Sequence, residues 1–241
     1  MNGFAQKVTD AISNLKSSPE YEPGKFIITR SAARTSIHNF GANFWQMDFA
    51  QMWYVGMLYL VEFADWDGQT TIGYGCSASG NVSEKNGKTD AMQYHTGTTA
   101  ANRTTYGYTQ YRNIEGWWDN VYDWMDGCYY NSNGLNVIEN PNQFSDDANG
   151  VLVGKPVGGY STDFTIPTQS GLEWALFPCA AFGNATNYDL DYWNFIGSYP
   201  CLYHGGSCIQ SRSFGLFYVS CTPGANDIIG CRLQERPPKA A

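Results

Sequence analysis

The residues of this chain that could carry out redox or metal chemistry are its cysteines, which number seven among 241 residues. No two of them have the C-x-x-C spacing of zinc ribbons and thioredoxin-like sites. Because the number is odd, at least one thiol cannot take part in an intramolecular disulfide. We predict that most are reduced, buried small hydrophobic side chains, and a Cys201–Cys231 or Cys208–Cys221 bridge stays open as an alternative. The seven are Cys76, Cys128, Cys179, Cys201, Cys208, Cys221 and Cys231.

Histidine is the other common metal ligand and base, and the chain has only His38, His95 and His204. They show neither H-x-x-x-H nor H-E-x-x-H spacing, so no histidine metal site is predicted. The sequence contains no Ser-His-Asp set and no phosphate-binding loop, and residues 73–75 lack the third glycine and the helix of a dinucleotide site. We therefore predict no catalytic residue, no metal ligand and no cofactor, and a protein that is not an enzyme.

The composition narrows the class of partner. Charged residues make up 15% and aromatic residues 16%, with 17 Tyr. Tyr supplies rigid contact area while Ser, Gly and Asn supply adaptable hydrogen bonds, so this composition is typical of recognition surfaces, and equally of a β-rich fold with many turns. The net charge of −8, without a basic patch, argues against nucleic acid and anionic membranes as partners. No apolar stretch approaches the length of a membrane span, so membrane insertion is not predicted.

The elements that would position a recognition site follow an N-terminal arm. Residues 1–24 are predicted to form this arm, with a short amphipathic helix over residues 1–16 and a turn at Glu22-Pro23-Gly24. The arm is a candidate for joining subunits into a homo-oligomer. Residues 25–241 are predicted to form one domain, whose tail from Glu235 onward we expect to be disordered.

The strongest helix pattern covers residues 46–66. Asp48 fits the N-cap position, and one face of the helix is apolar, which predicts packing against the core. That face carries Phe49, Trp53, Met57, Leu60 and Ala64.

Short strand patterns surround this helix. We expect strands at residues 26–29 and 71–75, and a long polar excursion over residues 80–101 in which residues 89–92 open a short helix. Further strand-like runs lie at residues 106–113, 121–130, 135–139, 172–177, 215–220 and 228–233. One main helix, many short antiparallel strands and long loops indicate the α+β class.

Six runs in the chain resemble a known family. Residues 111–127 read YRNIEGWWDNVYDWMDG and resemble the "YRGIEN-WGNVWEWVDG" signature of C-type-lectin folds of the formylglycine-generating-enzyme type. LYHGGS at residues 202–207 resembles "RGGSW", and IGCRL at residues 229–233 resembles the terminal "IGFRL". GLEWALFP, DYWN and GLFYV lie among them, at residues 171–178, 191–194 and 215–219. Their order resembles the variable proteins of diversity-generating retroelements, and residues 48–64 resemble forms from gut phages and prophages.

The resemblance implies a C-type-lectin-like fold and a hypervariable ligand-binding surface. In that family an error-prone reverse transcriptase alters adenines, so that Asn codons of the AAY type become many others but never Lys, Glu, Met, Gln or Trp. Residues 175–231 contain no Lys, Glu or Met, whereas the rest of the chain contains 21 of these residues. This window is therefore predicted to be the diversified region, with Trp193 and Gln210 as fixed scaffold positions.

The predicted ligand-binding residues lie in the loops of this window, where a side chain can change at little cost to the fold. Phe182, Ile196, Ile209, Arg212 and Phe214 are expected to be exposed contact anchors. The full set is Cys179, Ala180, Ala181, Phe182, Asn184, Ala185, Ile196, Ser198, Cys208, Ile209, Ser211, Arg212, Ser213, Phe214, Ser220, Thr222, Pro223, Ala225 and Asp227.

The resemblance implies a phage-tail receptor-binding protein that recognises a protein or glycan on a target cell. It is expected in the virion, or in the host cytoplasm before assembly. The alternatives are a bacterial surface adhesin and a calcium-dependent lectin, since residues 139–142 and 192–194 echo lectin calcium motifs. A copper oxidase of the formylglycine-generating type is a further alternative. That enzyme binds copper with a cysteine pair near its "GGS" element. Here Cys208 follows Ser207 directly and Cys201 and Cys221 are the other candidates, but the spacing departs from the enzyme pattern.

Overall fold

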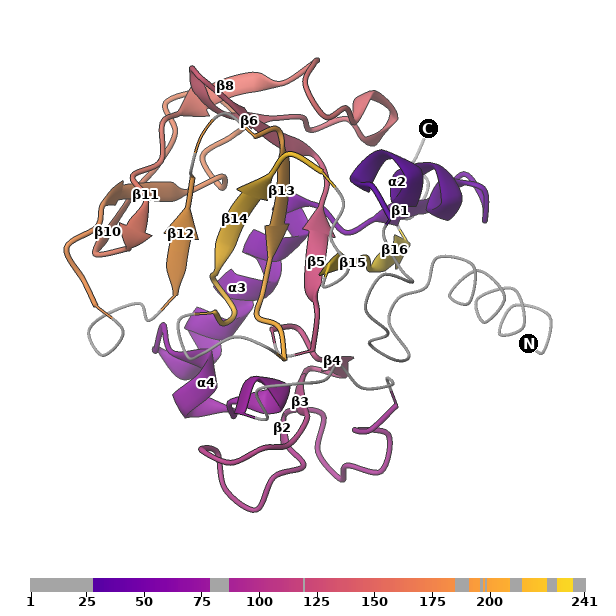
Figure 1. Cartoon of the computed structure of the whole chain (residues 1–241), viewed down its shortest axis with the longest axis vertical. Helices are drawn as coiled ribbons and strands as arrows, with labels where there is room; N and C mark the ends of the chain where they lie inside the picture. The colour runs from indigo at the N-terminus through magenta and orange to yellow at the C-terminus, as the bar shows by residue number, and fades with distance from the viewer. Residues whose placement is uncertain are drawn as a thin grey trace.

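The computed structural model describes residues 28–78, 87–118, 120–184, 191–195, 197, 199–208, 214–224 and 229–235. It is a mixed α+β structure, with few helices and many mostly antiparallel strands (Figure 1). The helices are α2 (Arg30–His38), α3 (Phe49–Phe63) and α4 (Gly68–Thr71), with 3-10 turns at Gly75–Ala78 and Pro141–Gln143. Among the described residues no helix is both long enough and apolar enough to cross a lipid bilayer.

The predicted main helix is α3, and its start is set locally. The Asp48 carboxylate accepts a hydrogen bond from the Gln51 backbone N–H at 2.9 Å, which satisfies one of the free donors of the first turn. The helix ends at Phe63: the Ala64 N–H still bonds to the Leu60 carbonyl, and the left-handed backbone of Ala64 (φ 51°) then turns the chain away from the helix axis. The predicted N-cap is thus confirmed.

The predicted buried face of α3 is only partly right. Phe49 and Trp53 are fully buried, but Met57 is exposed and so is Ala64. The residues that face the core instead include Met52 and Tyr59. Apolar side chains run almost all the way round this helix, so periodicity alone could not select the stripe that is covered.

The strand predicted at residues 26–29 is wrong for its described part. Thr29 caps helix α2 by accepting a hydrogen bond from the Ala32 backbone N–H at 3.2 Å. Residues 26 and 27 lie outside the described part of the chain, as does the N-terminal arm at residues 1–24. A threonine before a polar run fits a helix cap as well as a strand end, and here the contacts of α2 with the domain decide between them.

Two arginines anchor α2 to the domain. Arg30 is fully buried and donates to the Met125 and Cys128 carbonyls at 2.9 and 2.7 Å. It also pairs with Asp146 at 2.9 Å, while Arg34 bridges Asp126 and Asp146 at 2.6 Å each. Neighbouring carboxylates keep both guanidinium pKa values above their ordinary range, although burial opposes this. These ion pairs and hydrogen bonds hold α2 against the end of the central sheet.

The central sheet has six strands in the order β15-β5-β13-β14-β12-β9. They are β15 (Ile229–Gly230), β5 (Tyr122–Met125), β13 (Cys201–His204), β14 (Val219–Thr222), β12 (Tyr192–Asn194) and β9 (Gly159–Tyr160). The pairs β15–β5 and β12–β14 are parallel and the others are antiparallel. Helix α3 crosses behind this sheet in the view of Figure 1, so one side of the sheet faces the helix and the other faces the viewer.

Smaller sheets flank the central one. At one end lies the sheet of β6 (Cys128–Asn131), β7 (Gly134–Val137) and β8 (Val151–Gly154); at the other lies that of β2 (Gly97–Thr98), β3 (Thr109–Tyr111) and β4 (Ile114–Glu115) (Figure 1). Two pairs complete the structure, β1 (Phe44–Gln46) with β16 (Leu233–Glu235), and β10 (Asp163–Thr165) with β11 (Phe177–Ala180).

Several predicted strands are corrected by the structure. Residues 71–75 contain the last residue of α4 and the start of a 3-10 turn, and residues 89–92 form a turn where a short helix was expected. Only Phe177 of residues 172–177, and only Val219 and Ser220 of residues 215–220, lie in strands. The apolar side chains in residues 71–75, 172–177 and 215–220 pack against the core largely from turns, and short apolar runs do not reveal which backbone they adopt.

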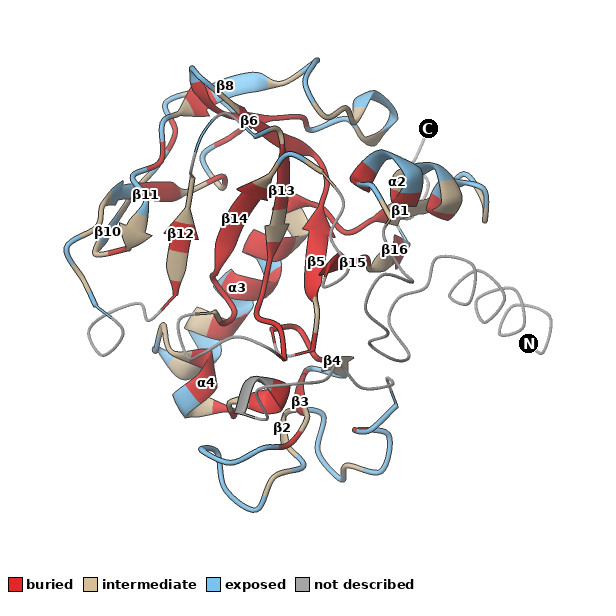
Figure 2. Ribbon diagram, in the orientation of Figure 1, coloured by how far each residue is buried: buried red, intermediate tan, exposed pale blue. Residues whose placement is uncertain are grey.

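The core sits on both sides of the central sheet (Figure 2). The larger cluster joins α3 to one side through Trp53, Trp193, Leu202 and Phe217, among others. The smaller cluster lies on the opposite side and includes Tyr122, Trp124 and Tyr218, together with Ala33 and Ile37 of α2. The central strands are therefore held from two sides.

Candidate ligand-binding face

The strand register assigns each side chain of the central sheet to one of two faces. Trp193, Leu202 and Val219 point toward α3 and have no exposed surface. Since successive residues of a strand alternate, their neighbours point away from α3. We call this second side the outer face; on β12, β13 and β14 it carries Tyr192, Asn194, Cys201, Tyr203, Ser220 and Thr222.

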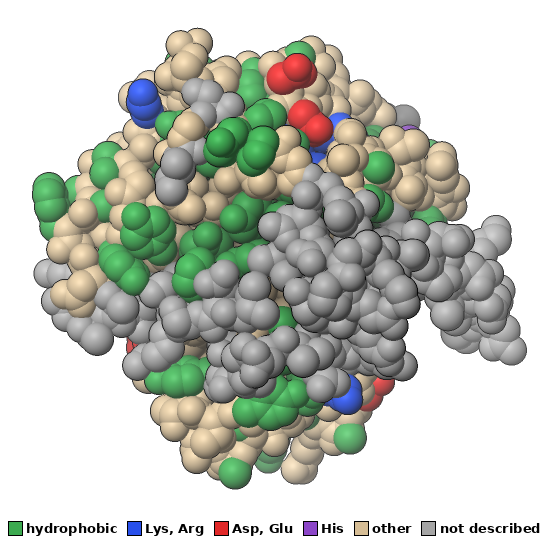
Figure 3. All heavy atoms as spheres, in the orientation of Figure 1, with side chains coloured by type: hydrophobic (Ala, Val, Ile, Leu, Met, Phe, Trp, Pro, Cys, Tyr) green, Lys and Arg blue, Asp and Glu red, His purple; other side chains and the backbone are tan. Residues whose placement is uncertain are grey.

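Aromatic rings dominate the outer face. Tyr203 lies 4.8 Å from Tyr122, and Phe214 lies 4.5 Å from Tyr218, measured between ring centroids. Tyr122 and Tyr218 stack at 5.6 Å and join the two pairs. Figure 3, which views this face, shows hydrophobic side chains gathered over β12 and β14. Such rings are large and rigid, so they lose little conformational freedom when they make a contact.

The sheet edge extends the aromatic surface. Tyr160 of β9 and Tyr192 of β12 pack edge to face, with centroids 5.1 Å apart, and both are half-buried. Burial raises the pKa values of Tyr122 and Tyr218, so their phenols stay neutral at any physiological pH. Both rings are buried, so they support the half-buried rings of Tyr203 and Phe214 from beneath.

A buried carboxylate holds the loop that carries Phe214. Asp191 accepts hydrogen bonds from the Gly215 and Phe217 backbone N–H groups at 2.5 and 2.6 Å. Burial raises the pKa of Asp191 to about 7, although these two N–H groups lower it. The carboxylate thereby ties the start of β12 to the turn before β14, two segments that lie 24 residues apart.

The glycines of the GGS element let this turn approach the core. A Cβ on Gly206 would overlap the carbonyl oxygens of Phe214 and Trp118, so no larger residue fits there. Gly205 has φ +76°, a backbone conformation that favours glycine. These positions are structural, because they fix the backbone under the aromatic cluster.

Ten of the nineteen predicted ligand-binding residues are described, and they fall into three groups. Cys179, Phe182, Asn184 and Pro223 are exposed, with Phe182 at 89%. Ala180, Ala181, Phe214 and Thr222 are half-buried, and Cys208 and Ser220 are buried. The others lie outside the described residues: Ala185, Ile196, Ser198, Ile209, Ser211, Arg212, Ser213, Ala225 and Asp227.

Cys208 and Ser220 are wrong as surface contact residues. Cys208 is 1% exposed, and its backbone N–H bonds to the Asn120 carbonyl at 3.0 Å, which draws the turn inward. Ser220 pairs in register with Tyr203, and its short side chain has no exposed surface beside that larger ring. Phe214 is also less exposed than an anchor was expected to be, since it packs against Tyr122 and Tyr218.

The structure adds residues that the sequence reasoning missed. Tyr192, Asn194 and Tyr203 lie on the outer face and are half-buried, and the predicted set does not contain them. The signal that could have found them is the period-two alternation with Trp193 and Leu202. The prediction placed binding residues in loops, whereas a strand also presents every second side chain to the surface.

The residues with possible redox or metal chemistry do not assemble a centre. Among the described residues no group of three or more His, Cys, Asp or Glu is placed to hold a metal ion. All seven cysteines are free thiols and six are buried, so the expectation of mostly reduced, buried cysteines is confirmed and neither alternative bridge forms. The exposed thiol is Cys179.

His204 and Asp146, an acid a few residues after the lectin-like run at residues 139–142, both have structural contacts. The His204 ring donates to the Met47 sulfur at 3.1 Å, and burial lowers its pKa to about 3, with Arg232 adding to the shift. Asp146, one of the acids near the lectin-like motif, is paired with Arg30 and Arg34. To bind calcium this carboxylate would have to leave both arginines, so the geometry does not favour the calcium-lectin alternative.

The comparisons with known proteins leave the candidate site to be judged on its geometry. No protein-family model matches the chain, and no curated protein sequence matches it either.

Proposed function

We propose that the chain is a ligand-binding protein with a hypervariable surface of the diversity-generating retroelement type, built on a C-type-lectin-like fold. Its binding surface is the outer face of the central sheet together with the loops that border it. On this proposal the protein serves as a phage-tail receptor-binding protein and has no catalytic role. The α+β architecture, with few helices and many antiparallel strands, is compatible with that fold.

The observation that carries the proposal is the contrast between the two faces of β12, β13 and β14. All six outer positions hold Tyr, Asn, Cys, Ser or Thr, each of which an altered AAY codon can encode. On the inner face only Trp193 is a residue that such a codon cannot encode, since Leu202, His204, Val219 and Cys221 could also arise from it. The contrast between the faces therefore lies mainly in burial, because Trp193, Leu202 and Val219 have no exposed surface whereas Tyr192, Asn194 and Tyr203 are half-buried. A diversified protein needs this separation, because its core must stay constant while its surface changes.

The physical basis of recognition is a fixed backbone that presents exchangeable side chains. Strands β12, β13 and β14 are held in place by packing against α3 and by the hydrogen bonds from Asp191 to the turn before β14. A backbone that is already ordered loses little entropy on binding, so affinity depends on the shape and polarity of the side chains. Half-buried Tyr side chains supply contact area, and their hydroxyls adapt to different polar partners.

A pair of libraries tests this separation. The outer library varies Tyr192, Asn194, Tyr203 and Thr222 among the residues that AAY codons can give, and the matched inner library varies Trp193, Leu202 and Val219 in the same way. We expect most outer variants to fold and some to bind new target proteins in display selection, while most inner variants fail to fold. Equal folding losses in both libraries would refute the proposal.

The retroelement origin has an independent test in the DNA. We expect a near-copy of the 3′ end of the gene, differing at adenine positions, beside a reverse-transcriptase gene. If the outer face binds targets but no such copy exists, the binding function stands and the retroelement origin is refuted.

A further inference from the structure

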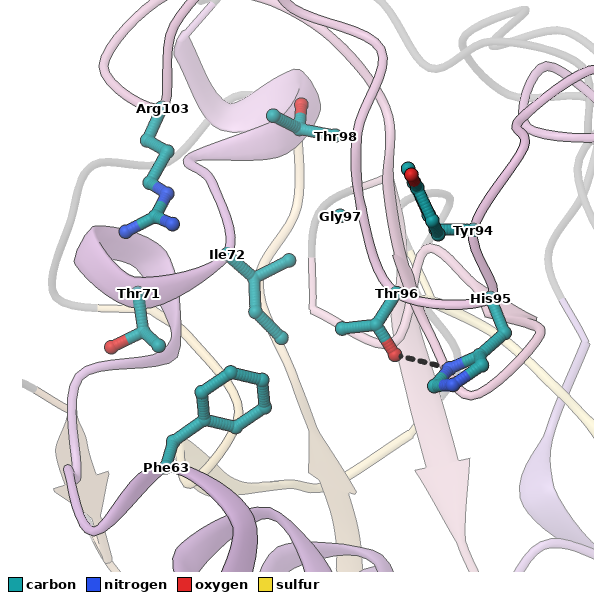
Figure 4. Close-up of a pocket in the computed structure, with 9 residues that line it drawn as sticks. All are labelled: Phe63, Thr71, Ile72, Tyr94, His95, Thr96, Gly97, Thr98 and Arg103. Carbon is teal, nitrogen blue, oxygen red and sulfur yellow. Dashed lines mark hydrogen bonds between the residues drawn. The ribbon is translucent and has the colours of Figure 1, made fainter.

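A pocket of about 370 Å³ lies between the ends of α3 and α4 and the strand β2 (Figure 4). Its lining residues are Phe63, Thr71, Ile72, Tyr94, His95, Thr96, Gly97, Thr98 and Arg103. The volume lies in the range of small-molecule sites, roughly 300–1,000 Å³. All of these residues precede the window of residues 175–231 and none lies on a strand of the central sheet, so the pocket is separate from the outer face.

Backbone hydrogen bonds hold the walls of the pocket in place. The Asn113 N–H bonds to the His95 carbonyl at 2.8 Å, and the Arg112 N–H bonds to the Thr96 hydroxyl at 3.1 Å. On the opposite wall the Tyr74 N–H bonds to the Arg103 carbonyl at 3.0 Å. The pocket is therefore formed by ordered segments, and a ligand would find it already shaped.

Arg103 is the unusual residue of this pocket. The structure describes five arginines, and four of them, Arg30, Arg34, Arg112 and Arg232, pair with carboxylates. No carboxylate within the described part of the chain pairs with Arg103, whose guanidinium turns toward Thr71 in Figure 4, across the pocket from His95. In a chain of net charge −8, an arginine without such a partner is available to an anion.

The remaining walls favour a ring that bears hydroxyl groups. Phe63 and the buried Ile72 form an apolar side against which C–H groups can pack. Thr71 donates its hydroxyl to Asp65 at 3.3 Å and also lies beside the Tyr59 hydroxyl, and its oxygen can still accept one hydrogen bond. Thr98 accepts from the Ala100 N–H at 3.2 Å, which leaves its hydroxyl proton free to donate. Mixed donors and acceptors match sugar hydroxyls, which do both.

We propose that this pocket binds a monosaccharide carboxylate, with the carboxylate on Arg103, the ring against Phe63 and Ile72, and the hydroxyls on the threonines. The inference goes beyond the proposed function. Because the pocket lies outside the diversified window, its specificity would stay constant while the outer face changes. One chain would then combine a fixed affinity for acidic sugars with a variable affinity for other targets.

Titration calorimetry or ligand-observed NMR on the full chain tests the ligand class with three probes. Glucuronate carries both the ring and the charge, glucose carries the ring alone, and acetate carries the charge alone. We expect glucuronate to bind at least about tenfold more tightly than either partial probe, because each of them uses only part of the pocket. Binding of acetate as tight as that of glucuronate would overturn the proposal. A dissociation constant for glucuronate weaker than roughly 10 mM would also overturn it.

Variants then locate the site. Arg103→Met should weaken glucuronate binding roughly tenfold or more, since it removes a charge-assisted hydrogen-bond pair. Arg112→Met is the matched control. It also removes a cation close to the pocket, but the Arg112 guanidinium is already paired with Glu62 at 3.0 Å. Equal losses in the two variants would show a general charge effect and overturn the assignment. Tyr94→Ser gives a second measurement, and this variant is expected to fold normally because the Tyr94 side chain is 70% exposed. An unchanged glucuronate affinity in both Arg103→Met and Tyr94→Ser would also overturn the assignment of the site.

Discussion

Two positions on opposite faces of the central sheet should differ sharply in how much stability they control. Leu202 on β13 is fully buried against the cluster that contains α3, whereas Asn194 on β12 is half-buried on the outer face. We expect Leu202→Ala to lower the free energy of unfolding by about 3–5 kcal/mol, because the lost burial adds to the energy of the cavity left behind. We expect Asn194→Ser to change it by about 0.5 kcal/mol or less, as for most surface exchanges.

The loss at Leu202 would be a large part of the whole stability. Domains unfold with about 5–15 kcal/mol, so a change of 3–5 kcal/mol brings the variant close to the unfolding limit. An outer-face change that removes an aromatic contact should lower the free energy of unfolding more than Asn194→Ser does, but less than Leu202→Ala does. Tyr192→Ser, for example, breaks the edge-to-face pair with Tyr160, and such pairs contribute roughly 0.5–1.5 kcal/mol.

Urea denaturation followed by tryptophan fluorescence and circular dichroism measures these differences. With a slope of about 1–3 kcal/mol per molar, Leu202→Ala should lower the midpoint by about 1 M or more, and Asn194→Ser should leave it nearly unchanged. Leu202→Met is the control, because it conserves volume and should cost less than about 1.5 kcal/mol. Similar midpoint losses for Asn194→Ser and Leu202→Ala would show that the two faces are not energetically separate.

Three further perturbations follow from buried contacts. Arg30→Met should cost about 3–5 kcal/mol in the same denaturation assay, because it leaves two buried backbone carbonyls without this donor and removes one of the two arginines that pair with Asp146. A cost below about 1 kcal/mol would contradict the role of Arg30 in holding α2 against the domain. Gly206→Ala should reduce the melting temperature strongly in calorimetry, because its Cβ would overlap two carbonyl oxygens, and a wild-type melting temperature would refute that. His204 stays neutral in the folded chain down to a pKa of about 3 while the unfolded form takes up a proton near pH 6.5, so its contribution to stability is present above pH 6.5 and is lost as the pH falls. His204→Phe should therefore lose less stability than the wild type between pH 6.5 and pH 4, and parallel pH profiles for the two proteins would rule this out.

The features that the sequence alone predicted are those that depend on local interactions. The N-terminus of α3 follows from Asp48 and the Gln51 N–H three residues on, so the cap could be read without knowing the fold. The α+β class and the reduced cysteines followed from pattern, spacing and composition in the same way. The apolar run over residues 215–220 shows the limit of such reading, because turn and strand bury similar side chains.

Only the tertiary structure decided which side chains form the outer face. Alternation along β12 and β13 separates Tyr192 and Tyr203 from Trp193 and Leu202, but which set is covered depends on where α3 packs. The same holds for Ser220, whose burial comes from a residue seventeen positions earlier, Tyr203, and for Asp191, which bonds to a turn 24 residues away. Local preferences act over a few residues, whereas burial is set by contacts between segments distant in the chain, and those contacts exist only once the chain has folded.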